Sequence, residues 1–132
     1  GQLFEGKGYS QDIIIRAILG FEENGIRLKT PLPEGTRIYM TRRDRDMVKE
    51  GTQKMAAKLL SSLKKPDETA YFYFDCSGRA SHLYGETEPD VNNLLDILGD
   101  KDIIGFFTFG EYAPVGGENY FHNYTGVILG IE

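Results

Sequence analysis

The sequence predicts an α+β fold, with a single mixed β-sheet of about six strands and two helices packed on it, in the order β-β-β-α-β-α-β-β. Three observations lead to this fold class. Runs of β-branched and aromatic residues predict strands, and two stretches of apolar residues at helical spacing predict helices. The 132 residues also lie in the usual size range of one globular domain, and no repeat or linker divides them.

The first part of the chain predicts three strands. The β-branched run Asp12–Leu19 and the alternating run Ile26–Thr30 flank Asn24-Gly25, a turn dipeptide, so we expect a β-hairpin there. Pro31–Gly35 predicts a second turn, because proline removes donors and glycine accepts unusual φ values. We expect the third strand over Thr36–Thr41.

An amphipathic helix is predicted from about Asp44 to Lys64. Apolar residues such as Val48, Met55 and Leu59 fall on one stripe, while lysines fill the other face. Pro66 ends this segment. Residues 42–65 carry a net charge of +5, which is typical of the solvated face of a helix.

The second half of the chain predicts a βαβ unit followed by one more strand. Thr69–Cys76 is a buried strand, and the helix over residues 87–98 starts at a sequence that resembles a capping box, Thr87–Asp90. Asp102–Phe109 is the next strand. A loop over 110–122 then leads to a last strand over 123–130.

Polar residues follow the ends of these strands. The two strands of a βαβ unit are parallel, so their carboxyl ends lie at one edge of the sheet, and an antiparallel last strand would start there. We therefore expect Asp75–Arg79, Gly110–Tyr112 and His122–Thr125 to converge at that edge. Crevices of this kind are where α/β sheets usually bind ligands.

Arg79 and Glu111 are the charged candidates for ligand contact. Arg79 is one of two cations among residues 66–132, which carry a net charge of −10, and its guanidinium suits a carboxylate. Glu111 could receive an ammonium group. The alternative is that the two pair with each other or with nearby acids.

Cys76 and His122 each allow more than one interpretation. Cys76 is either a small core residue or a thiolate activated by Arg79 or His122, which would allow a Cys-His-Glu triad. His122 is a haem axial ligand, a hydrogen-bonding residue of the pocket, or a residue that orders the loop, and we favour hydrogen bonding. We expect Asn123 and Thr125 to bond the backbone at a strand start, and Gly110 to form a turn.

The composition narrows the function classes. A net charge of −5 argues against a general nucleic-acid binder, which needs an excess of Lys and Arg. No apolar run is long enough to insert into a membrane, and no signal peptide is recognised at the N-terminus. A single cysteine fits a reducing compartment, so we expect a cytoplasmic protein.

Several of these motifs together resemble the FIST sensory domain family. The residues that carry the resemblance are GFFTFGEYAP and FHNYT between Gly105 and Thr125, FDCSGR at Phe74–Arg79, and RAILGF with LPEG between Arg16 and Gly35. The resemblance identifies the chain, residues 1–132, as a FIST C domain taken from a longer protein with a preceding FIST N domain. Tyr112-Ala113-Pro114 departs from the family pattern, in which an aliphatic residue usually follows the Gly-Glu pair.

The resemblance implies a non-catalytic, small-molecule-binding input domain of a bacterial signal transduction protein, with amino acids as suggested ligands and a signalling output domain as partner. On this basis we expect the ligand at Cys76, Arg79, Gly110, Glu111, Tyr112, His122, Asn123 and Thr125. Two alternatives remain open. One is a haem-binding nitric-oxide sensor, and the other is a thiol-dependent enzyme that uses Cys76.

Overall fold

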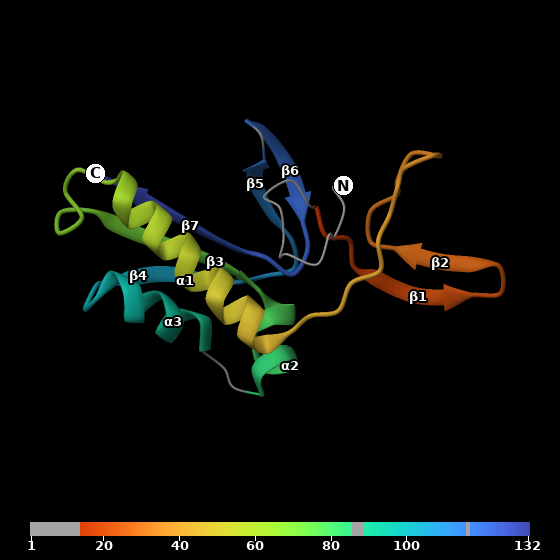
Figure 1. Cartoon of the computed structure of the whole chain (residues 1–132), viewed down its shortest axis with the longest axis horizontal. Helices are drawn as coiled ribbons and strands as arrows, with labels where there is room; N and C mark the ends of the chain where they lie inside the picture. Colours follow the sequence, from red (N-terminus) through yellow and green to blue (C-terminus); the bar gives the residue numbers. More distant parts are fainter. Residues whose placement is uncertain (1–13, 86–88, 116) are drawn as a thin grey trace.

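The computed structural model describes residues 14–85, 89–115 and 117–132. The α+β class is confirmed, and the strands divide among three small sheets instead of one (Figure 1). The strands are β1 (Ile18–Glu22), β2 (Gly25–Leu28), β3 (Ala70–Cys76), β4 (Ile103–Thr108), β5 (Glu111–Val115), β6 (Glu118–His122) and β7 (Gly126–Ile131). The helical segments are α1 (Arg45–Ser62), a short 3-10 turn (Ser77–Arg79), α2 (Ser81–Tyr84) and α3 (Pro89–Leu98).

The central sheet has the order β4-β3-β7. β3 pairs with β4 in parallel, from Tyr71 opposite Ile103 to Cys76 opposite Thr108, and β7 runs antiparallel to β3. The predicted βαβ unit and the direction of the last strand are therefore confirmed. This pairing places the carboxyl ends of β3 and β4 at one edge, next to the start of β7.

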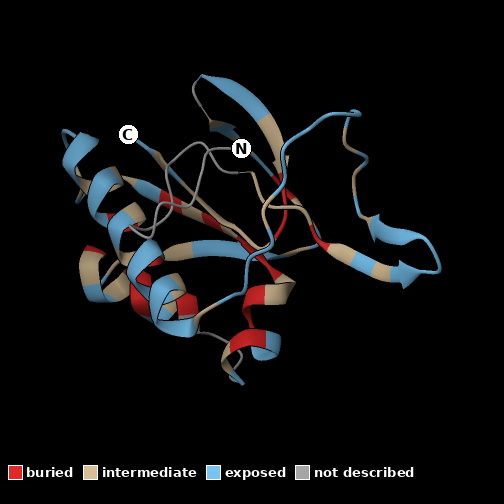
Figure 2. Cartoon of the chain, turned by 45° about the vertical axis from the view of Figure 1, so that its right-hand side comes forward, coloured by how far each residue is buried: buried red, intermediate tan, exposed pale blue. Residues whose placement is uncertain are grey.

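The core lies between this sheet and the two longer helices. Tyr71 and Tyr73 of β3 pack with Ala56 of α1 and with Leu94 and Leu98 of α3. Figure 2 shows the buried residues gathered along β3, at the turn after it and on the inner sides of the helices. Since successive side chains of a strand point to opposite faces of the sheet, Phe72 and Phe74 lie on the face away from the helices.

Both predicted helices are present. Asp44 caps α1, because its Oδ1 accepts a hydrogen bond from the backbone N–H of Met47 at 3.2 Å. Leu63 closes this helix three residues before Pro66. The end of α3 at Leu98 matches the prediction, and its predicted start, with Thr87 and Glu88 of the proposed capping box, lies outside the described residues.

Three details of the prediction were wrong. Residues 36–41 form no strand and belong to no described sheet, because a β-favourable sequence forms a strand only where a partner edge is available. The expected loop 110–122 contains the β5–β6 hairpin. The strands of the first hairpin lie closer to the turn than expected: β1 runs to Glu22 and β2 starts at Gly25, so that these two residues pair across Glu23-Asn24.

The β1–β2 and β5–β6 hairpins extend away from the central sheet (Figure 1). Within the described residues no helix is long and apolar enough to cross a lipid bilayer.

Candidate functional site

Polar residues from three segments meet at the carboxyl edge of the central sheet. The Thr108 hydroxyl oxygen lies 3.1 Å from the carbonyl oxygen of Asp75, and the N–H of Cys76 donates to the carbonyl oxygen of Thr125 at 3.0 Å. These contacts join the ends of β3 and β4 to the start of β7. The sheet pairing thus brings together residues that are about fifty positions apart in the chain.

Glu111 is the buried acid at the centre of this edge. It is only 3% exposed, and its carboxylate accepts hydrogen bonds from the hydroxyls of Thr108 and Thr125, the latter at 2.9 Å. Two hydroxyl donors stabilise the carboxylate in an environment that otherwise disfavours charge. Glu111 is therefore held in one orientation by groups from two strand ends.

A cavity of about 190 Å³ adjoins Glu111. Three of the predicted site residues line it: Gly110, Glu111 and Tyr112. Its other walls come from the central sheet: Phe74, Phe106, Thr108 and Val127. The cavity thus combines one carboxylate with two aromatic rings, Phe74 and Phe106, that pack edge to face at 5.2 Å between centroids.

The β5–β6 hairpin forms the rim of this cavity. Tyr112 is 73% exposed, and its ring lies 5.4 Å from that of Phe121. A Cβ atom on Gly110 would lie 2.3 Å from the Phe121 ring, so a side chain at this position would displace the ring. The absence of a side chain at Gly110 therefore lets the Phe121 ring of β6 pack against the backbone just before β5.

Arg79 does not join this cavity. Its Nε lies 2.8 Å from Oδ2 of Asp90 and 3.3 Å from Oδ1 of Asp75, and its Nη2 donates to the Thr52 hydroxyl at 2.6 Å. Among the alternatives that the sequence left open, the structure has Arg79 paired with nearby acids, but not with Glu111. We call Arg79, Asp75, Asp90 and Thr52 the buried ion-pair cluster.

Two members of this cluster were missed in the sequence. Thr52 is 2% exposed and lies on the buried stripe of α1, four residues before Ala56. Asp90 is 1% exposed and was interpreted only as part of a helix cap. The signal that could have found them is a polar residue in the apolar stripe of each helix.

Asp75 links the cluster to the edge of the sheet. Burial raises its pKa to about 7, Arg79 opposes this shift, and the negative charges of Asp90 and Glu111 add to it. The hydroxyl of Tyr73 also donates to Oδ1 of Asp75 at 3.2 Å. Asp75 therefore changes its protonation state near neutral pH.

Cys76 lies beside Glu111 but is not activated. Burial raises the pKa of its thiol, and the nearby Glu111 adds to this shift. A thiol with a raised pKa carries little thiolate at neutral pH, so it is a poor nucleophile. This favours the interpretation of Cys76 as a small core residue.

His122 and Asn123 connect the hairpin to neighbouring backbone. His122 is 6% exposed, and its Nε2 lies 3.0 Å from the carbonyl oxygen of Ala113 on the facing strand. The Asn123 side-chain oxygen accepts a hydrogen bond from the N–H of Ala17 at 3.0 Å, and its amide group donates to the carbonyl of His122. Both residues therefore hold backbone in place.

The contacts of His122 favour its hydrogen-bonding role. Its Nε2 is engaged, and the residue lines neither the Glu111 cavity nor the larger cavity described below. Among the described residues, no group of three or more His, Cys, Asp or Glu side chains is arranged to hold a metal ion.

Comparison with known proteins agrees with the resemblance seen in the motifs. The FIST C domain family matches residues 3–114. Uncharacterized protein Rv0628c of Mycobacterium tuberculosis H37Rv is 28% identical over 116 residues, which cover 86% of this chain and 30% of that protein. Uncharacterized protein Mb0898c of Mycobacterium bovis is 35% identical over 52 residues, or 39% of this chain and 14% of that protein.

The chain therefore spans less than a third of the length of either relative. No solved structure gives a significant match. Because the family match covers most of the sequence, the chain belongs to the FIST C domain family, a family of sensory domains of signal transduction proteins.

Proposed function

We propose that this domain binds a small molecule at the Glu111 cavity and passes the binding signal to the rest of a signal transduction protein. The observation that carries the proposal is the buried Glu111 carboxylate in a cavity with two phenylalanine rings. Ligand sites are mostly apolar and contain a few oriented polar groups, and this cavity has that composition.

The chemistry of the cavity favours a ligand with an ammonium group. A buried carboxylate attracts a cation, and a cation placed over the face of Phe74 or Phe106 would gain a further attraction. An amino acid supplies that group. Its side chain would contact the phenylalanine rings, while Tyr112 would lie over the entrance.

The other predicted residues support this site in different ways. Thr125 orients Glu111, His122 and Asn123 fix the hairpin, and Cys76 lies buried beside Glu111. Arg79 acts as a positioning residue through Asp75 in this proposal, because its guanidinium is already shared within the buried ion-pair cluster.

We further propose that the domain acts beside a FIST N domain and an output domain in a cytoplasmic protein, and that it has no catalytic activity of its own. The raised pKa of Cys76 supports binding over thiol chemistry. Ile104 and Phe106 of β4 are 67% and 65% exposed, and exposed apolar surface of this kind supports a contact with another domain. Because Phe106 also lines the Glu111 cavity, such a domain would complete the ligand site.

The test is calorimetric titration of the standard amino acids into the protein and into its Glu111→Gln variant. The variant removes the charge and keeps one oxygen as an acceptor for one of the two threonine hydroxyls, while its NH2 group faces the other. We expect at least one amino acid to bind and its affinity to fall tenfold or more in the variant, or about 1.4 kcal/mol. Glu118→Gln, an exposed acid on β6, is the matched control and should bind normally.

The titration is run in a protein that contains both FIST domains. If no amino acid binds this protein, or if Glu111→Gln binds as tightly as the wild type, the proposal is wrong.

A further inference from the structure

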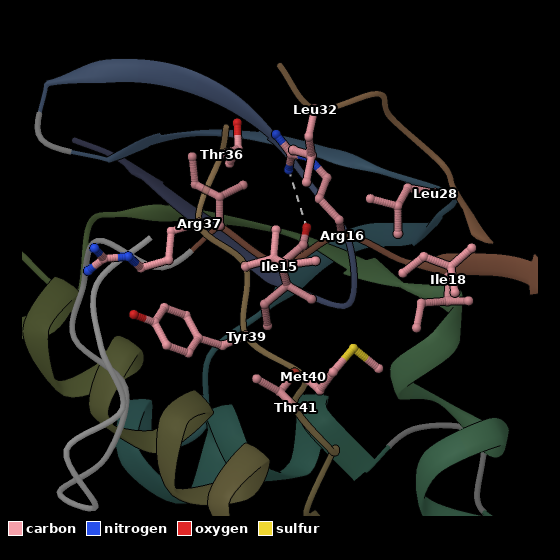
Figure 3. Close-up of a pocket in the computed structure, with 13 residues that line it drawn as sticks. Ile15, Arg16, Ile18, Leu28, Leu32, Thr36, Arg37, Tyr39, Met40 and Thr41 are labelled. Carbon is pink, nitrogen blue, oxygen red and sulfur yellow. Dashed lines mark hydrogen bonds between the residues drawn. The ribbon is translucent and has the colours of Figure 1, made fainter. Parts of the chain in front are cut away.

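A second and larger cavity lies between the β1–β2 hairpin and the segment 32–41. Its volume is about 240 Å³, and eight of its thirteen lining residues are aliphatic or methionine. Figure 3 shows Ile15 at its centre, with Leu28 on one side and Tyr39 on the other. None of its lining residues is acidic, and two of them are cations, Arg16 and Arg37. We call this space the Arg16 cavity.

One of the donors of the Arg16 guanidinium is buried. Its Nη1 donates to the carbonyl oxygens of Phe121 at 2.7 Å and Ile15 at 3.2 Å. Its Nε is buried and has no hydrogen-bond partner among the described residues, where it is the one side-chain polar atom in that state. Buried polar groups are almost always satisfied in native proteins, so this donor indicates an acceptor that comes from outside the described structure.

The charge of the site selects an anion. An arginine is always protonated in proteins, so Arg16 brings a permanent positive charge to an apolar wall whose described residues include no carboxylate. A carboxylate is the natural partner, because its two oxygens match the donors of the guanidinium. Arg37 in the same lining adds a second positive charge.

The walls and the volume limit the rest of the ligand. Aliphatic side chains favour an alkyl chain, and 240 Å³ holds about eight groups of the size of a water molecule. Hexanoate has a carboxylate and a short alkyl chain of this total size. We propose that the Arg16 cavity is a second ligand site, independent of Glu111, that binds a small apolar carboxylate with its anionic end at Arg16.

The first experiment compares three probes on the unmodified 132-residue chain: hexanoate, 1-hexanol and hexylamine. All three have six carbon atoms in an unbranched chain, and they differ in the head group, which is an anionic carboxylate, a neutral hydroxyl or a cationic ammonium. We expect hexanoate to bind with a dissociation constant below about 1 mM, at least tenfold more tightly than hexanol, and hexylamine not to bind. Isoleucine methyl signals from the cavity wall, such as those of Ile15 and Ile26, should shift with hexanoate.

The second experiment uses variants. Arg16→Gln should reduce hexanoate affinity tenfold or more, and Arg37→Gln should reduce it by a smaller factor without affecting folding, because Arg37 is exposed. Arg27→Gln, an exposed arginine of β2 that lies outside the cavity lining, is the matched control and should leave the affinity unchanged. Glu111→Gln should also bind hexanoate normally, which separates this site from the Glu111 cavity.

Three results would overturn the proposal. These are hexanol binding as tightly as hexanoate, hexanoate binding that is lost in Glu111→Gln, and no saturable binding of hexanoate at all. If Arg16→Gln does not fold, the probe comparison and the Arg37→Gln titration still decide the question.

Discussion

Two arginines lie against the interior of this domain, and their surroundings differ. Arg79 contacts two buried carboxylates and a threonine hydroxyl, all from the protein itself. Arg16 contacts only backbone carbonyls and keeps a buried N–H without an acceptor among the described residues. A cation whose partners all come from the fold belongs to the scaffold, whereas a cation with a free donor beside a cavity is available to a ligand. The same residue type therefore supports two different inferences.

Removing Arg79 should have the largest effect. Arg79→Met would leave Asp75 and Asp90 buried without a counter-charge, and breaking a buried pair in this way costs about 3–5 kcal/mol. We expect this loss in the free energy of unfolding, measured by urea denaturation at pH 7.5. The control is Arg27→Met, whose pair with Glu22 is 64% exposed on both sides and should contribute less than about 1 kcal/mol. A loss for Arg79→Met as small as that of the control would mean that the cluster is not part of the scaffold.

The pH dependence of the same cluster gives the second prediction. Asp75 has a pKa of about 7 in the fold against 3.8 when unperturbed, so the folded state binds the extra proton between these values. Stability from this group is therefore highest at acidic pH, falls as the pH rises from about 4 to 7, and stays constant above that. Asp75→Asn removes this slope.

Thermal unfolding between pH 5 and pH 8 measures this effect. The melting temperature of the wild type should fall relative to that of Asp75→Asn as the pH rises. Asp96→Asn, a change at an exposed position of α3, should follow the wild type. Parallel curves for wild type and Asp75→Asn would show that Asp75 does not titrate in this range.

The central part of the fold could be predicted from local pattern. Buried strands, helix stripes and the βαβ rule identified α1, β3, α3, β4 and β7 and their directions. The structure of residues 36–41 could not be predicted in this way, because an alternating sequence becomes a strand only where another strand offers a free edge to pair with. The β5–β6 hairpin was missed for a related reason, since Pro114 and the glycines around it are typical of a loop.

The candidate site was predicted in position but not in its pairings. Strand order was enough to place Glu111 and Thr125 near Cys76. The rarity of cations in the second half made Arg79 a candidate anchor, but Thr52 and Asp90, which pair with it, come from helices whose packing the sequence did not specify. The Arg16 cavity has no sequence signal of its own, because it depends on how segment 32–41 lies against the hairpin.

Thr52 offers a smaller test of the buried cluster. Its hydroxyl accepts from Nη2 of Arg79 and donates to Oδ1 of Asp90 at 3.0 Å. Thr52→Val keeps the shape but leaves both groups with one partner fewer, which costs about 1–3 kcal/mol. Urea denaturation should place this variant between Arg79→Met and the wild type. A stability equal to that of the wild type would show that Arg79 and Asp90 need no third partner.

The smallest effect on stability is expected at Arg16. Arg16→Met loses the hydrogen bonds to Phe121 and Ile15 but also removes the unpartnered N–H, so the free energy of unfolding should fall by only about 1 kcal/mol. Hexanoate then separates the two arginines. At ten times its dissociation constant it should stabilise the wild type by about 1.4 kcal/mol and leave Arg16→Met unchanged. A loss of stability at Arg16 as large as that at Arg79 would show that Arg16 also supports the folded structure, and the contrast between the two arginines would then rest on hexanoate binding alone.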